Sequence, residues 1–199
     1  MMENQNTVRY DRSLVEAAQL PQETRDLLLL SGLPQFHMNQ EALMGIHFEA
    51  RTDQGLIRTK DGRKTMFPIG YEWDEITALL GLEADTGLLY TLNVHTGEYG
   101  VINSSLSLFL TFLKKYDAFV NEYSRSYEPS VMTLEQAQAK LAAFRRGEVT
   151  PPAQKYSPQA RKKAIKQLRL FYTDSDPASV AKEDTWWSVV LEQLEDEIL

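Results

Sequence analysis

The side chains that most often carry out chemistry are scarce in this sequence. It has three histidines and no cysteine, which excludes disulfides, cysteine nucleophiles and cysteine-ligated zinc. His47 and Glu49 are two positions apart, so on a β-strand both would face the same side of the sheet and could bind a metal ion together. Structural pairing on that sheet face explains the same spacing, and we favour this interpretation over a metal site.

A serine triad is the second chemical possibility. It would combine Ser104 or Ser105 with His95 and Asp85. Serines in front of an apolar helical pattern are also helix caps, and His95 and Asp85 lie in sequences typical of hairpin turns. Phosphate-binding glycine loops, the G-x-S-x-G elbow and the H-E-x-x-H zinc motif do not occur in the chain. We therefore expect a protein that is not an enzyme and needs no cofactor or metal.

The elements that would position these residues follow from the hydrophobic pattern. From about residue 43 to 102, short apolar runs are separated by turn sequences such as Asp85-Thr86-Gly87. Strands this close in sequence leave no room for crossover helices, so they should pair mainly antiparallel. The predicted strands are Leu43–Glu49, Leu56–Thr59, Thr65–Tyr71, Ile76–Glu83, Gly87–Asn93 and Tyr99–Ile102.

Helices are predicted on both sides of this region. A short leucine-rich helix begins at Pro21 and is closed by Gly32. After the capping pair Asn103-Ser104, apolar residues recur at helical spacing as far as Tyr123. Three further helices are predicted after Thr133 up to Gly147, from Pro158 to about Tyr172, and from about Asp184 to the end.

Charge is uneven along the 199-residue chain, whose formal net charge is −7. Residues 149–173 carry six bases and no acid, whereas residues 174–199 carry eight acids and one base. The longest apolar runs, such as Leu27 to Leu30, fall far short of the roughly 18 residues that cross a membrane. The N-terminus also lacks the apolar stretch of a signal peptide. We therefore expect a cytoplasmic protein that makes no membrane contact.

One candidate partner-binding site is the segment Glu72, Trp73, Asp74 and Glu75 between two predicted strands. An exposed tryptophan among three acids would be a good interface anchor for a basic partner. The alternative is that Trp73 folds back into the core.

A second candidate partner-binding site lies in the predicted last helix. Trp187 belongs to its buried stripe, and Glu192, Glu195 and Asp196 point away from it. Acids are unfavourable there, because the helix dipole already places partial negative charge at a C-terminus. The arrangement points either to a cationic partner surface or to pairing with the chain's own basic helix, and both interpretations stay open.

That basic helix, residues 158–172, carries Lys162, Lys166 and Arg169 opposite its apolar stripe. These side chains could contact nucleic-acid phosphates, with an affinity that falls steeply in salt. A solvated helix face explains them as well. We favour the solvated face because the chain as a whole is acidic and would be repelled by phosphates.

Five short motifs occur in a characteristic order along the chain. They are Gly32-Leu33-Pro34, Phe67-Pro68-Ile69-Gly70, Asp85-Thr86-Gly87, Asn103-Ser104-Ser105-Leu106, and Trp187 with Leu191-Glu192-Gln193-Leu194-Glu195-Asp196. Each is common by itself, but their order and spacing over residues 20–124 and the last helix resemble the SUKH superfamily. The chain is most similar to a bacterial immunity branch of that superfamily.

The resemblance implies an α+β fold with a mainly antiparallel twisted sheet of about six strands flanked by helices, and with a helical C-terminal extension. We accordingly expect a polar tail over residues 1–12 and a single SUKH-like domain over residues 13–199. The core of that domain would cover about residues 20–124, and its helical extension residues 133–199.

The resemblance also implies a function. Such proteins bind and neutralise a cognate polymorphic toxin, here a nuclease or a deaminase, by stoichiometric occlusion. We expect a basic toxin to be the partner of a monomer of this chain, at the two acidic segments. A general protein-interaction scaffold or regulator on the same fold is the alternative function, followed by a nucleic-acid binder that uses helix 158–172.

Overall fold

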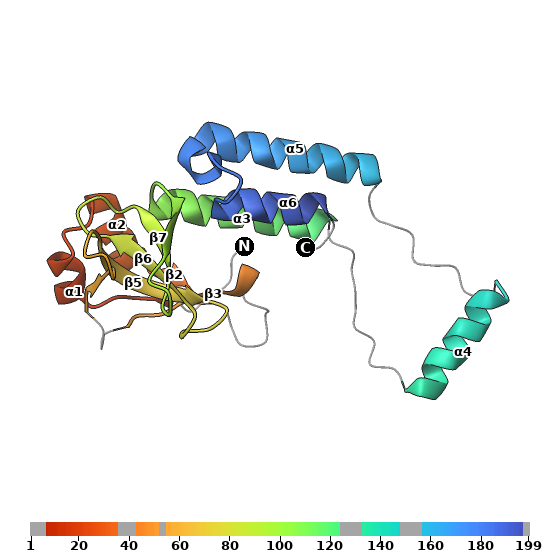
Figure 1. Cartoon of the computed structure of the whole chain (residues 1–199). Helices are drawn as coiled ribbons and strands as arrows, with labels where there is room; N and C mark the ends of the chain where they lie inside the picture. Colours follow the sequence, from red (N-terminus) through yellow and green to blue (C-terminus); the bar gives the residue numbers. More distant parts are fainter. Residues whose placement is uncertain (1–6, 36–42, 52–54, 124–132, 148–156, 197–199) are drawn as a thin grey trace.

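A computed structural model describes residues 7–35, 43–51, 55–123, 133–147 and 157–196 (Figure 1). At its centre is a six-stranded antiparallel sheet in the order β3-β5-β6-β7-β8, with β4 also paired to β5. The predicted α+β class and antiparallel sheet are confirmed. The strands are β3 (Ile46–Phe48), β4 (Ile57–Arg58), β5 (Thr65–Glu72), β6 (Ala78–Glu83), β7 (Leu89–Asn93) and β8 (Tyr99–Asn103).

Strand β5 organises the sheet because it pairs along both of its edges. Its register against β6 shifts between Pro68 and Gly70, where the strand bulges. The backbone of β3 passes so close that a Cβ on Gly70 would lie 2.0 Å from the carbonyl oxygen of His47. Only glycine fits this position, which explains why the Phe67–Gly70 motif ends in a glycine.

The five predicted helices are present. Their bounds are α2 (Gln22–Asp26), α3 (Leu106–Tyr123), α4 (Leu134–Arg145), α5 (Pro158–Ser175) and α6 (Trp186–Glu195), with a π-helical turn η1 (Leu27–Ser31) after α2 and 3₁₀ turns η2 (Leu43–Gly45) and η3 (Pro177–Val180). Ser157 caps α5 by accepting a hydrogen bond from the backbone N–H of Ala160 at 3.1 Å. Within the described segments, no helix is long and apolar enough to cross a membrane.

Residues 7–12, expected in a polar tail, pack against the rest of the fold. Strand β1 (Thr7–Val8) pairs with β2 (Leu33–Pro34) in a separate two-stranded sheet. Tyr10 is buried, and its hydroxyl donates a hydrogen bond to a backbone oxygen of β5. Asp11 then caps the short helix α1 (Arg12–Ala17). An antiparallel pairing and a buried aromatic ring therefore hold this segment in place.

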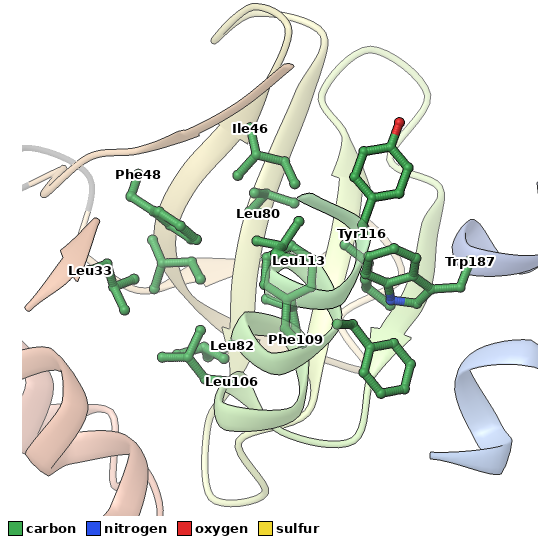
Figure 2. Packing of buried hydrophobic residues seen from close by; sticks show 14 of the residues in the cluster. Leu33, Ile46, Phe48, Leu80, Leu82, Leu106, Phe109, Leu113, Tyr116 and Trp187 are labelled. Carbon is green, nitrogen blue, oxygen red and sulfur yellow. The ribbon is translucent and has the colours of Figure 1, made fainter. Parts of the chain in front are cut away.

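The main core lies between one face of the sheet and the helices α3, α5 and α6 (Figure 2). Phe109 and Phe112 of α3 pack against Trp187 of α6, with ring centroids 6.3 and 5.4 Å apart. Tyr172 of α5 stacks on Phe112 at 4.1 Å. Trp187 is fully buried, as the helical pattern predicted.

The opposite face of the sheet has a smaller apolar cluster of its own. Met66, Leu79, Tyr90 and Leu92 are buried there, and Ile57 of β4 packs against them. Both faces of the central strands are therefore apolar.

A buried polar network ties the sheet to the C-terminal helices. Asp176, at the end of α5, accepts hydrogen bonds from the Asn103 side chain at 2.9 Å and from the Ser104 N–H and hydroxyl at 2.8 and 2.6 Å. The indole N–H of Trp187 donates to the Asn103 oxygen at 2.8 Å. Asn103 and Ser104, predicted to cap α3, thus bind Asp176, while the Ser105 hydroxyl caps that helix.

Candidate partner-binding groove

One end of the sheet brings together the β5–β6 loop, the β7–β8 loop and η2. The N–H of Val94 donates to the carbonyl of Thr77 at 2.9 Å, which joins the two loops. Three large apolar side chains of these loops reach solvent: Trp73, Ile76 and Val94 are 70%, 64% and 46% exposed. Apolar exposure of this extent commonly marks an interaction surface.

A groove of about 670 Å³ opens beside this end, between the sheet and α6. On the sheet side, Thr91 of β7 and Gly100 of β8 lie directly opposite each other and are too small to fill the space. On the helix side, the lining residues form one helical stripe: Trp186, Val189, Val190 and Gln193. The groove thus forms where small sheet residues face the apolar side of a helix.

Trp73 stands at the mouth of this groove in a strained backbone conformation. Its φ of 62° lies in the left-handed region, which is unfavourable for a large side chain. The N–H of Trp73 donates to the carbonyl of Gly45 at 2.7 Å, and a Cβ on Gly45 would lie 2.4 Å from the indole ring. The absence of a side chain on Gly45 therefore lets the ring lie there, and the core alternative for Trp73 is not realised.

Glu72 lines the groove next to Trp73 and is half-buried. Both of its carboxylate oxygens lie 3.2 Å from the indole nitrogen of Trp186, which donates to them across 114 positions of sequence. Burial raises the pKa of the Glu72 carboxyl above its ordinary value, and hydrogen bonds with Trp186 and Trp73 offset part of this rise. The groove wall thus contains a partly desolvated carboxylate whose donors here are neutral indoles.

Asp74 and Glu75 play different parts in the same loop. Asp74 accepts hydrogen bonds from the N–H of Ile76 at 3.0 Å and the hydroxyl of Thr77 at 2.9 Å, and so shapes the turn. The Thr77 hydroxyl in particular lowers the pKa of Asp74. Glu75 is exposed and pairs with Arg51 at 3.4 Å. Both residues are exposed next to Trp73 and lie outside the groove lining.

The C-terminal end of α6 is partly compensated by α5. Arg169 pairs with Glu195 at 3.0 Å, and the buried Arg161 donates to the carbonyl of Leu194 at 2.7 Å. Of the two interpretations for the α6 acids, pairing with the chain's own basic helix therefore applies to Glu195. Cations near a helix C-terminus stabilise its free carbonyls and oppose the unfavourable acids.

Glu192 and Asp196 are exposed. Glu192 lies one helical turn beyond Val189 of the groove, Asp196 lies one turn beyond Gln193, and Glu195 lies at the end of α6. About 13 Å of helix separates that end from Trp186. The structure thus places Glu72 and Trp73 in the groove wall and the α6 acids beside its Gln193 end.

The serine triad is not assembled. Ser104 donates to Asp176, and Ser105 caps α3. His95 and Asp85 follow and precede β7 at opposite ends of the strand, whose five residues span about 16 Å. The hydroxyls of Ser104 and Ser105 thus have structural hydrogen-bond partners.

Among the described residues, none joins His47 and Glu49 in a group that could hold a metal ion. His47 stacks on Tyr71 with ring centroids 4.9 Å apart, which is the structural pairing that we favoured. Across the segments that the structure describes, no group of three or more His, Asp or Glu side chains could hold a metal ion.

Comparison with protein families gives one decisive match. A model for the SUKH-4 immunity protein family matches residues 1–193. The chain belongs to this family. Membership supports an immunity role for the SUKH-4 chain and implies a cognate toxin as its partner. Neither the curated proteins nor the solved structures contain a significant match.

The motifs that pointed to SUKH proteins occupy junctions of this SUKH-4 fold. Phe67–Gly70 contains the bulge of β5, and Asp85–Gly87 forms the β6–β7 turn. Asn103–Leu106 joins β8 to α3 through the Asp176 network. These residues specify the scaffold, whereas nearly all of the groove lining lies outside them.

Several groove residues of the SUKH-4 chain were not predicted. Thr91 and Gly100 were assigned to strands without a role in a site, and Trp186 was not among the predicted site residues. A signal was available in the α6 stripe, because Val189 lies three positions beyond Trp186 and Gln193 four further on. On the sheet side, no local sequence pattern marks Thr91 and Gly100 as groove residues.

Proposed function

We propose that this SUKH-4 protein neutralises a nucleic-acid-cleaving or deaminating toxin by binding it one to one and covering its working surface. The observation that carries the proposal is the family match over residues 1–193. The separation of Ser104, His95 and Asp85 favours action by binding over action by catalysis. The protein would act as a monomer in the cytoplasm of the cell that makes the toxin.

The docking surface would be the acidic, partly apolar end of the molecule. It combines the exposed Trp73 with Glu72, Asp74, Glu75 and Glu192 around the groove. Acids of this kind speed association with a basic partner, and a central aromatic residue supplies much of the binding energy. A stable complex would bury about 1,200–2,000 Å² in total.

The test is protection of living cells. Each toxin-like gene beside the gene for this chain is expressed from an inducible promoter, with the chain supplied from a second plasmid. We expect survival with the wild-type chain and death with Leu191→Asp, which places a charge in the α6 core. Death in both cases for every neighbouring candidate would reject the proposal, and a locus without toxin-like neighbours would favour the scaffold alternative.

A further inference from the structure

We propose that the groove beside α6 receives an arginine side chain from a cationic segment of the toxin. This inference rests on the proposed immunity function and deepens it by naming the chemical group that the surface recognises. It is carried by the shape of the groove, the charge along it and the conformation of Trp73.

The walls of the groove suit the stem and the plane of an arginine. Trp73, Tyr99 and Trp186 present aromatic surface to it, and Val189 adds an aliphatic wall. The methylene stem of arginine packs on apolar surface, and its planar guanidinium stacks on aromatic rings. The groove volume of about 670 Å³ is ample for one such side chain with part of its backbone.

The charge of the groove selects a cation. Glu72 offers a half-buried carboxylate in the wall, and the donors that the structure shows for it, the Trp186 and Trp73 indoles, are neutral. A guanidinium would add an opposite charge and a planar set of N–H donors, which match a carboxylate better than two neutral indoles do. Lys182 and Asp184 line the other end of the groove with opposite charges.

The surroundings of the groove are also acidic. Asp74, Glu183 and Glu192 are exposed at positions next to lining residues. An anionic partner segment would therefore be repelled, and a cationic one attracted.

Trp73 supports a role in recognition because its conformation lowers stability. A left-handed φ is unfavourable for a non-glycine residue, and Trp73 is nevertheless 70% exposed. Folding alone gives little reason for an indole here, whereas an aromatic plane at the mouth of a cation-binding groove is useful. A guanidinium between this ring and Glu72 would stack on the ring and pair with the carboxylate.

The first experiment uses nuclear magnetic resonance of the ¹⁵N-labelled full chain. The probe is acetyl-Arg-Gly-Arg-Gly-Arg-amide, with the matching lysine and glutamate peptides as comparisons. The chain has three tryptophans, whose indole N–H signals can be assigned by single Trp→Phe variants. We expect saturable shifts of the Trp73 and Trp186 signals with the arginine peptide. The Trp187 signal should not shift, because its indole N–H is hydrogen-bonded to Asn103 in the core.

Two variants locate the site. Glu72→Gln keeps an acceptor for Trp186 but loses the charge, and we expect about tenfold weaker arginine-peptide binding. Glu16→Gln makes the same chemical change on the exposed face of α1 and should leave binding unchanged. The inference is overturned by absent indole shifts, by equal shifts with the glutamate or lysine peptide, or by equal binding of Glu72→Gln and the wild type.

The second experiment returns to cell protection and separates the two proposals. Trp73→Gly removes the ring and suits the left-handed backbone, so the fold should be kept, as a circular dichroism melt can verify. We expect the wild type to protect and both Trp73→Gly and Glu72→Gln to protect at least tenfold less well. Equal protection by the variants would overturn the arginine groove and leave the immunity function standing. Failure of the wild type would reject the immunity function, while the peptide result still decides the groove.

Discussion

Asp176 shows how a single side chain can fix several elements. It is 2% exposed and holds Asn103 and Ser104 at the start of α3. Asp176→Ala would leave three donors without their acceptor, and each loss costs about 1–3 kcal/mol. We expect the free energy of unfolding in urea to fall by about 3 kcal/mol or more. Asp174→Ala, on the exposed side of the same helix, should change it by less than about 0.5 kcal/mol, and similar effects of both would contradict the network.

Glu72 makes a pH-dependent contribution to stability. Because its folded-state pKa is raised by burial, the unfolded state ionises first as the pH rises past the ordinary value of 4.5. Folding is therefore penalised above that pH, whereas below it both states are protonated and the penalty vanishes. Glu72→Gln removes the penalty, so we expect its melting temperature to exceed that of the wild type at pH 7 and to match it near pH 3. A variant that melts below the wild type at pH 7 would contradict this account.

The burial or exposure of a single side chain could be predicted only where the hydrophobic periodicity of its helix or strand determines it. The spacing of Trp187 within an apolar helical stripe predicts its burial, and the structure confirms it. The contact between Glu72 and Trp186 could not be predicted, because the two residues are 114 positions apart and no local pattern links them. Even the exposure of Trp73 stayed open, since it depends on Gly45 in another loop.

At the scale of elements, α6 is held against α3 chiefly by Trp187. This ring is fully buried and contacts Phe109, Phe112 and Tyr172. Trp187→Ala leaves a large cavity, so we expect a loss of about 3–5 kcal/mol in the free energy of unfolding. Val189→Ala, two positions along the same helix but 38% exposed, should cost less than about 1 kcal/mol in the same urea titration. An unchanged midpoint for Trp187→Ala would mean that α6 is not docked on α3.

The elements themselves were largely predictable because turn and cap chemistry is local. Hairpin sequences located the sheet strands, and Thr133 with Gln136 forms a capping box at the predicted start of α4, with reciprocal hydrogen bonds of 3.0 and 3.3 Å. The pairing of β1 with β2 was missed because it joins short segments about 25 positions apart. Asp11 before Leu14 and Val15 is a capping signal for α1 that the sequence does contain.

At the scale of the whole molecule, acidic and basic side chains lie on different surfaces. The groove end and the outer side of α6 are acidic, whereas the outer side of α5 exposes Lys162, Lys163 and Lys166. Arg161 and Arg169 instead face α6 and compensate its C-terminus. The two opposite surfaces arise because the basic helix meets the acidic helix along only one of its sides. A cationic partner would be drawn to the groove end and away from α5.

This polarity predicts how fast the toxin associates. Glu192→Lys with Asp196→Lys reverses two exposed acids on α6, and it improves the match to the helix dipole by about 0.3–1 kcal/mol per site. We therefore expect a slightly higher melting temperature together with roughly tenfold slower association with the toxin found by the protection test, measured by stopped-flow fluorescence at low salt. The difference should shrink at 1 M salt, where the screening length is about 3 Å.

Glu23→Lys with Asp26→Lys makes the same charge change on α2, which packs at the opposite end of the sheet through Pro21 and Gly87. Equal slowing by both pairs would show that net charge alone, and not the acidic groove end, directs association.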